Sequence, residues 1–90
     1  MTIFDDTFDF HNEGLLEPNQ IFYILEKFIN DSHDQNNSHL LIITGKADTG
    51  SGLVKRTVLS SLKKIKMVKK FRIAFAEDGG SGAVEVWLKD

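Results

Sequence analysis

The chain has 90 residues and a formal net charge of −2, with 41% hydrophobic and 27% charged residues. A chain of this size and composition is one ordinary globular domain, which buries only about 60–65% of its unfolded surface. The absence of cysteine excludes a disulfide framework and a thiolate metal site, and it fits a reducing compartment. The longest apolar run, at 40–43, is too short to span a membrane, and the acidic N-terminus does not resemble a signal peptide. We therefore expect a cytoplasmic protein with no membrane partner, formed by an N-terminal tail at residues 1–6 and one domain at residues 7–90.

The small net charge hides an uneven distribution along the chain. Residues 1–48 carry nine acidic residues against two basic ones, whereas residues 49–76 carry eight basic residues and no acidic one. The eight are Lys55, Arg56, Lys63, Lys64, Lys66, Lys69, Lys70 and Arg72. Such a one-signed stretch is typical of a surface that binds phosphate backbones. A solvated helix face followed by a basic loop explains it equally well.

Hydrophobic periodicity and turn residues divide the chain into six regular elements. In order, these are a strand at 7–11, a helix from Pro18 to about 30–33, a strand at 39–44, a helix at 51–65, and strands at 68–75 and 83–88. The glycine-rich loop 45–52 precedes the second helix, and residues 76–82 are expected to form a hairpin loop. The apolar stripes of these elements, together with Trp87, are expected in the core.

The order β-α-β-α-β-β predicts an α/β fold, a two-layer sandwich in which two helices pack against a mixed four-stranded sheet. Strands joined by a crossover helix run parallel, so the first two strands should end at the same edge of the sheet. His11 then lies near Thr44, Gly45 and Lys46, at the edge where open α/β sheets gather their ligands. The second helix begins just after the loop, and its unpaired N–H groups favour a phosphate there.

The sequence Phe-Asp-Phe-His at 8–11 places Asp9 and His11 on one face of the first strand. A histidine can take or give a proton near neutral pH. Asp9 is close enough to orient it, to bind a shared hydroxyl or to hold a metal through water. Together with the glycines and the lysine of the loop after the second strand, this pair suits cleavage of a phosphodiester, particularly in RNA, whose 2′-hydroxyl is an internal nucleophile. An Asp-x-His pair on a strand is, however, more often a surface pair than a catalytic one.

The loop after the second strand combines glycines with a cation. Gly45, Gly50 and Gly52 allow a polyanion to approach the backbone, and Lys46 supplies a positive charge beside them. The spacing is not that of a Walker A motif, and a plain flexible loop also explains it. Gly-Gly-Ser-Gly at 79–82 is adequately explained by the turn chemistry of a hairpin.

Three motifs, in this order, resemble those of the small MutS-related (Smr) domain family. Phe-Asp-Phe-His is similar to the family's Leu-Asp-Leu-His motif, Ile-Ile-Thr-Gly-Lys at 42–46 to its His/Thr-Gly-x-Gly motif, and residues 79–89 to its closing Gly-Gly-x-Gly-Ala strand. The resemblance covers about residues 7–89. It implies a two-layer α/β domain related to the C-terminal domain of a bacterial translation initiation factor. It also implies nucleic-acid binding and, in several members, an endonuclease that nicks DNA or cleaves RNA, in some cases mRNA on stalled ribosomes.

Carried over by position, the resemblance makes Asp9 and His11 the catalytic pair. The candidate nucleic-acid-binding residues are Thr44, Gly45, Lys46, Gly50, Gly52, Lys55, Arg56, Gly79 and Gly80. The chain departs from the family pattern at three positions. Asn12 replaces the glycine that follows the histidine, Ala47 replaces the second glycine of the loop motif, and Asp48 adds a negative charge to that loop. The last two departures bear on catalysis more than on binding.

The leading hypothesis is a monomeric endonuclease that binds RNA or DNA, with the ribosome as a further partner. His11 acts as general base or acid, Asp9 orients it or the nucleophile, and Lys46, Lys55 and Arg56 hold the phosphates. No cofactor follows with certainty, because an Asp-His pair is compatible with metal-free chemistry and with a route assisted by Mg²⁺. Two alternatives stay open: a non-catalytic RNA- or DNA-binding module, and a protein-interaction adaptor that uses the acidic N-terminal half.

Overall fold

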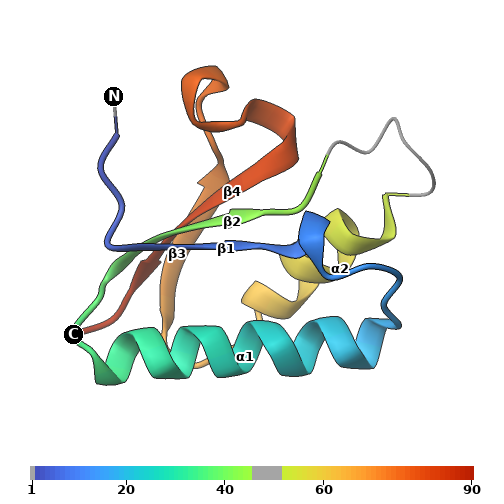
Figure 1. The fold of residues 1–90 in the computed structure, drawn as a ribbon. Helices are drawn as coiled ribbons and strands as arrows, with labels where there is room; N and C mark the ends of the chain where they lie inside the picture. The colour runs from blue at the N-terminus through green and yellow to red at the C-terminus, as the bar shows by residue number, and fades with distance from the viewer. Residues whose placement is uncertain (1, 46–51) are drawn as a thin grey trace.

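The computed structural model describes residues 2–45 and 52–90, and Figure 1 shows its fold. The strands are β1 (Asp6–Asp9), β2 (His39–Ile43), β3 (Val68–Ile73) and β4 (Ala83–Leu88), and the α-helices are α1 (Pro18–Asp34) and α2 (Leu53–Leu62). Three short 3₁₀ turns follow β1 or connect β3 to β4: η1 (Phe10–Asn12), η2 (Ala76–Asp78) and η3 (Gly80–Gly82). The order of strands and α-helices is the predicted one, so the α/β fold class is confirmed.

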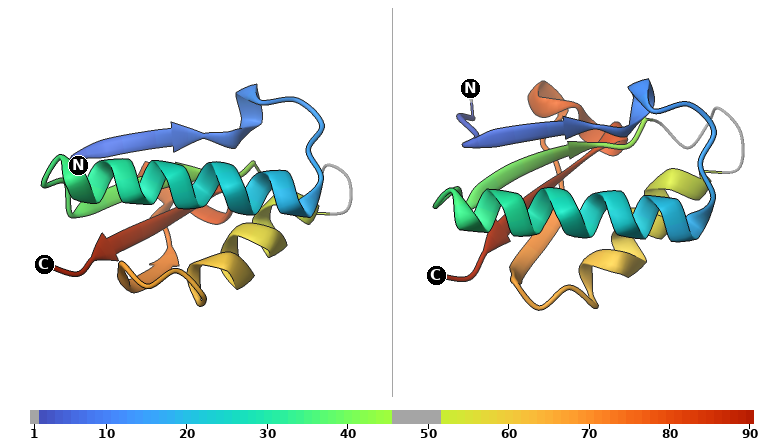
Figure 2. Two further views of the ribbon diagram at one scale, coloured as in Figure 1. Left: turned by 90° about the horizontal axis from the view of Figure 1, so that it is seen from below. Right: turned by 60° about the horizontal axis from the view of Figure 1, so that its bottom comes forward.

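The four strands form one mixed sheet in the order β1-β2-β4-β3. β1 pairs in parallel with β2, as predicted, and Asp9 lies opposite Ile43 at the end of the pair. β4 lies antiparallel between β2 and β3, and the register with β3 shifts between Val68 and Lys70. α1 and α2 cover the same side of the sheet, which gives the predicted two layers (Figures 1 and 2).

The long helix α1 begins at a proline, as the sequence predicts. The Glu17 backbone N–H donates to Oε1 of Gln20 at 2.8 Å, which satisfies a donor that the helix geometry leaves open. Ile21, Leu25 and Ile29 recur at helical spacing and are fully buried. Neither α1 nor any other helix in the described part of the chain has the length and apolar character needed to cross a membrane.

The main core lies between the sheet and the two helices. Phe8 packs its ring against those of Phe10 and Phe28, with centroids 4.8 and 5.3 Å apart. The buried members of this core are Phe10, Ile21, Leu25, Ile29, Leu40, Ile42, Val58, Leu62, Ile65, Val84, Val86 and Leu88. A second, smaller cluster contains no helical residue: Phe4, Leu41, Ile43, Ala74 and Ala83. The sheet therefore has one face under the helices and one face outside them.

Several boundaries differ from the sequence-based expectation. β1 ends at Asp9, because the Asp9 carboxylate accepts a hydrogen bond from the His11 N–H and starts η1 instead of continuing the strand. α2 and β3 also end earlier than expected, at Leu62 and Ile73, and the hairpin loop folds into η2 and η3. Trp87 was expected in the core and is only half-buried. It lies on the outer face of the sheet, because its two neighbours on β4 point into the main core.

Candidate nucleic-acid site at the ends of β1 and β2

The ends of β1 and β2 lie side by side, which brings two distant sequence motifs together. Beyond the Asp9–Ile43 pair, the chain of β1 turns into η1, and the chain of β2 continues to Thr44 and Gly45. A Cβ atom on Gly45 would lie 3.6 Å from Cδ2 of His11, so the imidazole is close to this backbone. His11 is exposed. The fold therefore presents the imidazole to solvent directly beside the glycine of the loop motif.

Asp9 positions His11 through the backbone. Its Oδ1 accepts a hydrogen bond from the His11 N–H at 2.8 Å, as the N-cap of η1. The sequence predicts the two side chains on one face of a strand, and the turn replaces that arrangement. Because this bond holds His11 in the turn η1, it fixes the place from which the imidazole projects.

Hydrogen bonds tie the loop motif to the closing glycine motif. The N–H groups of Thr44 and Gly45 donate to the Gly82 carbonyl at 2.8 and 3.1 Å. Thr44 is buried, and its hydroxyl lies 3.3 Å from the same carbonyl and 3.1 Å from that of Gly45. Gly45 has φ +80°, a left-handed conformation that costs glycine little. All three sequence motifs therefore meet at one end of the sheet, where Thr44 links the end of β2 to Gly82.

The start of α2 lies at the same end of the molecule as η1 and the end of β2 (Figures 1 and 2). Gly52, with φ +70°, is the N-cap of α2, and its carbonyl accepts from the Arg56 N–H at 3.0 Å. Lys55 and Arg56 lie on the first turn of this helix. Lys55 is half-buried and Arg56 is exposed. Four loop residues that the sequence singles out lie outside the described residues: Lys46, Ala47, Asp48 and Gly50.

Gly79 and Gly80 have backbone conformations that the turn requires. Gly79 has φ +119°, and a Cβ atom there would lie 2.8 Å from the Cβ of Ala83. Gly80 has φ +55°, with open space where a Cβ would stand. The turn alone therefore accounts for both residues, and their contact with nucleic acid stays a prediction.

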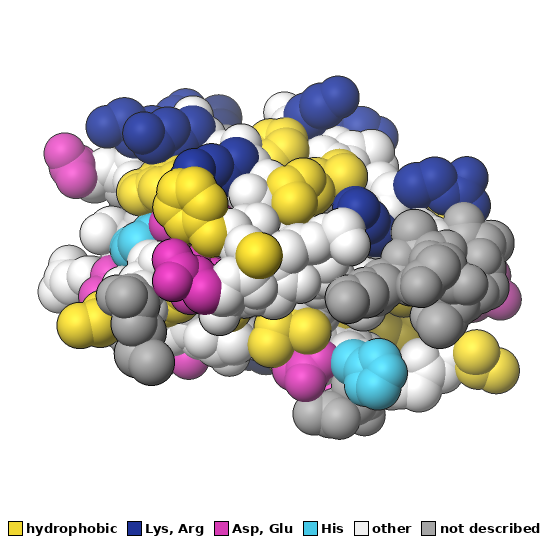
Figure 3. All heavy atoms as spheres, turned by 90° about the horizontal axis from the view of Figure 1, so that it is seen from above, with side chains coloured by type: hydrophobic (Ala, Val, Ile, Leu, Met, Phe, Trp, Pro, Cys, Tyr) yellow, Lys and Arg dark blue, Asp and Glu magenta, His cyan; other side chains and the backbone are white. Residues whose placement is uncertain are grey.

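The basic stretch belongs to the folded surface and follows α2, the next turn and β3. β3 lies at an edge of the sheet. The exposed residues of the basic stretch are Arg56, Lys63, Lys64, Lys66, Lys69, Lys70 and Arg72. In the view from above, Lys and Arg side chains gather along one border of the outer face of the sheet (Figure 3). A polyanion along this border of the molecule meets several cations.

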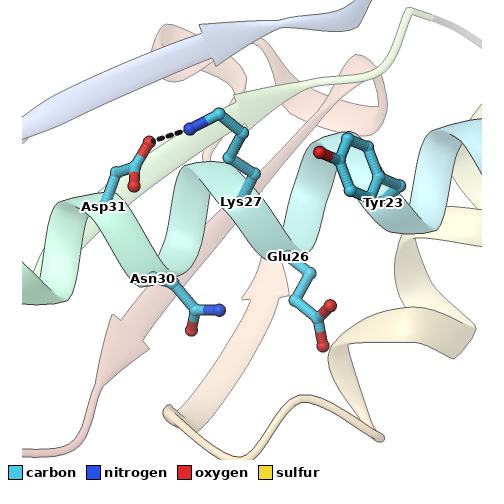
Figure 4. A pocket seen from close by; sticks show the side chains of 5 residues that line it. All are labelled: Tyr23, Glu26, Lys27, Asn30 and Asp31. Carbon is cyan, nitrogen blue, oxygen red and sulfur yellow. Dashed lines mark hydrogen bonds and ion pairs between the residues drawn. The ribbon is translucent and has the colours of Figure 1, made fainter.

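A shallow hollow of about 300 Å³ lies on α1, away from the three motifs (Figure 4). Its lining residues are Tyr23, Glu26, Lys27, Asn30 and Asp31. The hydrogen bond from Lys27 Nζ to Asp31, at 3.0 Å, raises the pKa of Lys27. This hollow is an ordinary polar helix surface. In the ranges that the structure describes, no three His, Cys, Asp or Glu side chains gather into a group suited to a metal ion.

The fold and the meeting of the three motifs define a two-layer α/β domain with an exposed histidine at the carboxyl edge of a parallel strand pair. The chain belongs to the Smr domain family, whose pattern matches residues 11–89. The match includes His11, Thr44 and Gly45 and begins two residues after Asp9. The family resemblance stated from the motifs is therefore confirmed.

Curated relatives agree with this membership, and solved structures agree with the fold. Endonuclease MutS2 of Carboxydothermus hydrogenoformans is 35% identical over 66 residues, and that of Aquifex aeolicus 38% over 65 residues. These alignments cover 73% and 72% of this chain but only 8% of each relative, so the chain spans a small part of their length. The Smr domain of Thermus thermophilus MutS2 superposes with a TM-score of 0.76 at 19% identity, over 94% of this chain and 98% of that one. YdaL, a stand-alone small MutS-related protein from Escherichia coli, also gives 0.76, at 23% identity, over 93% and 64%.

Proposed function

We propose that this chain is an endonuclease domain that cleaves the backbone of RNA or nicks DNA, with mRNA on a stalled ribosome as one substrate. The observation that carries the proposal is the exposed imidazole of His11 beside the backbone of Gly45. Relatives named Endonuclease MutS2 support a nuclease activity. The basic residues of α2 and β3 support a polyanionic ligand.

The chemistry of an imidazole suits the cleavage of RNA without further groups. Neutral His11 accepts the proton of a 2′-hydroxyl, and the resulting oxygen attacks the neighbouring phosphorus. The bond from phosphorus to the 5′ oxygen of the next nucleotide breaks, which leaves a 2′,3′-cyclic phosphate. The departing 5′ oxygen takes a proton from the imidazolium or from water. In DNA, which lacks the 2′-hydroxyl, the same imidazole accepts a proton from a water molecule whose oxygen attacks the phosphorus. The bond from phosphorus to one bridging oxygen breaks, and that oxygen takes a proton from the imidazolium or from water as it leaves.

Neighbouring residues have positioning and binding roles in this proposal. Asp9 holds η1, so that the imidazole of His11 projects at the end of β1. Gly45 carries no side chain that would keep a phosphate from the backbone. Lys55 and Arg56, on the first turn of α2, neutralise the charge of the bound strand.

Replacement of one histidine tests the proposal directly. We expect His11→Ala to lower the cleavage rate of end-labelled single-stranded RNA or of supercoiled circular DNA by about 10²–10⁴-fold, the usual contribution of a general acid or base. His33→Ala is the matched control, because His33 lies in the last turn of α1 and outside the three motifs. Reactions with Mg²⁺ and with EDTA decide whether the cleavage needs a divalent ion. Equal cleavage by the two variants refutes the assignment of His11.

One observation favours a second candidate, a module that binds nucleic acid without cleaving it. Ala47 and Asp48 depart from the family's loop motif, and Asp48 adds a negative charge to a loop that is expected to face phosphates. This candidate predicts no cleavage by the purified protein. It also predicts an affinity for RNA or DNA that falls with salt at about 0.7–0.9 per phosphate neutralised, on logarithmic scales.

A further inference from the structure

One face of the sheet lies outside the helical layer. Along β4, Val84 and Val86 point into the main core, so Glu85 and Trp87 point to the opposite face. The N-terminal segment and η2 border this outer face, and the Thr2 hydroxyl donates to Asp78 at 2.6 Å. In Figure 1 the turns between β3 and β4 rise on the side of the sheet away from α1. The outer face is therefore a partly bordered surface that α1 and α2 leave uncovered.

Aromatic and basic side chains form a row across this outer face. His39 on β2, Trp87 on β4 and Lys70 on β3 lie opposite one another in the strand register. The rings of His39 and Trp87 stack with centroids 5.1 Å apart and an interplanar angle of 16°. Nζ of Lys70 lies 4.6 Å from the centroid of the Trp87 ring. An exposed cation is thus held over an indole in the middle of a sheet.

A second row of side chains, beside the row of His39, Trp87 and Lys70, holds Arg72 in place. Glu85 is 2% exposed, and its carboxylate accepts from Nε of Arg72 at 2.9 Å and pairs with Nη2 at 2.8 Å. Nε2 of His39 lies 2.5 Å from the other carboxylate oxygen. The Arg72 guanidinium lies 3.9 Å from the centroid of the Phe75 ring. Because Glu85 and Phe75 hold the guanidinium, its plane is oriented before any ligand arrives.

We propose that Lys70, Arg72, Phe75 and Trp87 form a contact surface for single-stranded nucleic acid on the outer face of the sheet. Phosphates pair with Lys70 and with the outward N–H groups of Arg72, and a base stacks on Phe75, which is 50% exposed. A single strand fits this surface better than a duplex, because only unpaired bases offer their faces to aromatic rings. The Lys and Arg side chains along the border of this face complement the charge of the strand (Figure 3).

The contact surface is distinct from the histidine site. It deepens the proposed function, because the choice of nucleic acid as its ligand rests on that function. The histidine site is built from η1 and the end of β2, whereas the contact surface is built from β3, β4 and the start of η2. A single strand that crosses the sheet toward the ends of β1 and β2 would use both surfaces. The proposal concerns affinity and the choice between single strand and duplex, so it does not depend on cleavage.

A pair of double variants tests the contact surface. Lys70→Ala/Phe75→Ala removes one cation and one aromatic ring from the outer face, and Tyr23→Ala/Lys27→Ala removes the same two kinds of group from α1 (Figure 4). The probe is a fluorescein-labelled oligothymidylate of about 20 nucleotides, long enough for more than one binding site, with the matching duplex as a second probe. Anisotropy is measured with EDTA over a range of salt concentrations, and thermal melts establish that each variant is folded.

We expect the outer-face variant to bind the single strand at least about fivefold more weakly than the natural protein, since one stacked base contributes that much. The loss should be smaller for the duplex, and the α1 variant should bind both probes as the natural protein does. The single variants separate the two contributions. Lys70→Ala should lower the slope of log affinity against log salt by about 0.7, and Phe75→Leu should lower affinity with the slope unchanged.

The outcomes separate this proposal from the endonuclease assignment. Equal affinities of the two double variants for the single strand would overturn the contact surface, even if His11 proves to be catalytic. An equal loss on single strand and duplex would also overturn it, because the stacking contribution would then be absent. A selective loss by a protein that never cleaves would support the contact surface and refute the endonuclease. A natural protein with no salt-dependent affinity for either probe would refute both.

Discussion

Gly79 and Gly80 are adjacent in the sequence, but the structure predicts different costs for an alanine at each. Gly79 has φ +119°, a region that side chains rarely adopt, and an alanine there costs about 1–3 kcal/mol in backbone strain. The new Cβ would lie 2.8 Å from the Cβ of Ala83, which is fully buried on β4. Such overpacking costs a further 1–3 kcal/mol or so. At Gly80, with φ +55° and open space, only the left-handed strain of about 1–2 kcal/mol applies.

The measurement is the thermal midpoint of each variant by circular dichroism or calorimetry. In a domain of this size, 1 kcal/mol shifts the midpoint by about 4–8 °C. Gly79→Ala should therefore lower it by roughly 10 °C or more, and Gly80→Ala by roughly 4–15 °C, with Gly79→Ala always the lower of the two. Gly14→Ala, with φ +78° and open space, should behave like Gly80→Ala. Equal midpoints for Gly79→Ala and Gly80→Ala would refute the packing argument.

Two further changes test the polar contacts of the sheet. The Glu85 side chain is 3% exposed and pairs with Arg72 and His39, so Arg72→Ala leaves His39 as the remaining partner of the two. The free energy of unfolding, measured with urea, should therefore fall by roughly 3 kcal/mol. Lys70→Ala, at an exposed position on the same strand, should change this stability little. The N–H groups of Ser38 and His39 donate to the Asp5 carboxylate at 2.9 and 3.0 Å and hold its pKa below the usual range. A lowered folded-state pKa stabilises the fold above the ordinary carboxyl pKa, and this contribution is lost as pH falls through the folded value. The difference in thermal midpoint between the natural protein and Asp5→Asn should therefore become smaller as the pH is lowered from about 6 to about 3. A difference that stays constant over this range would contradict the linkage.

The sequence predicts the elements and the meeting of the two main motifs because both follow from local patterns. Helical spacing in α1 and the apolar run of β2 are strong signals, and the crossover rule places the ends of β1 and β2 together. The structure confirms this pairing, with Asp9 opposite Ile43. The position of the His11 imidazole beside Gly45 follows from it.

Two features of the site were missed for physical reasons. The turn η1 depends on one side chain to backbone hydrogen bond at Asp9, and such a bond competes with a strand without changing the alternating pattern. The bonds from Thr44 and Gly45 to Gly82 depend on β4 lying beside β2, and the strand order does not follow from the order of elements.

The sequence of β4 carries a signal for the outer face of the sheet. β4 reads Ala-Val-Glu-Val-Trp-Leu, a nearly continuous apolar run in which one acid interrupts the pattern. With Val84, Val86 and Leu88 assigned to the core by alternation, Glu85 and Trp87 must share the other face. A lone acid inside a buried strand also predicts a basic partner across the sheet, and the structure supplies Arg72.

The position of β3 at the edge of the sheet bears on how copies of this chain avoid one another. An edge strand offers unpaired backbone groups to the edge of a neighbouring molecule, and lysines or a bulge on that strand discourage such pairing. β3 carries exposed lysines and a register shift between Val68 and Lys70, whereas the opposite edge, β1, has only four residues. We expect the exposed cations of β3, which include the Lys70 and Arg72 that we assign to nucleic-acid contact, to oppose edge-to-edge pairing of two copies. Removing several of them at once, to abolish binding, should raise the tendency of the purified protein to self-associate.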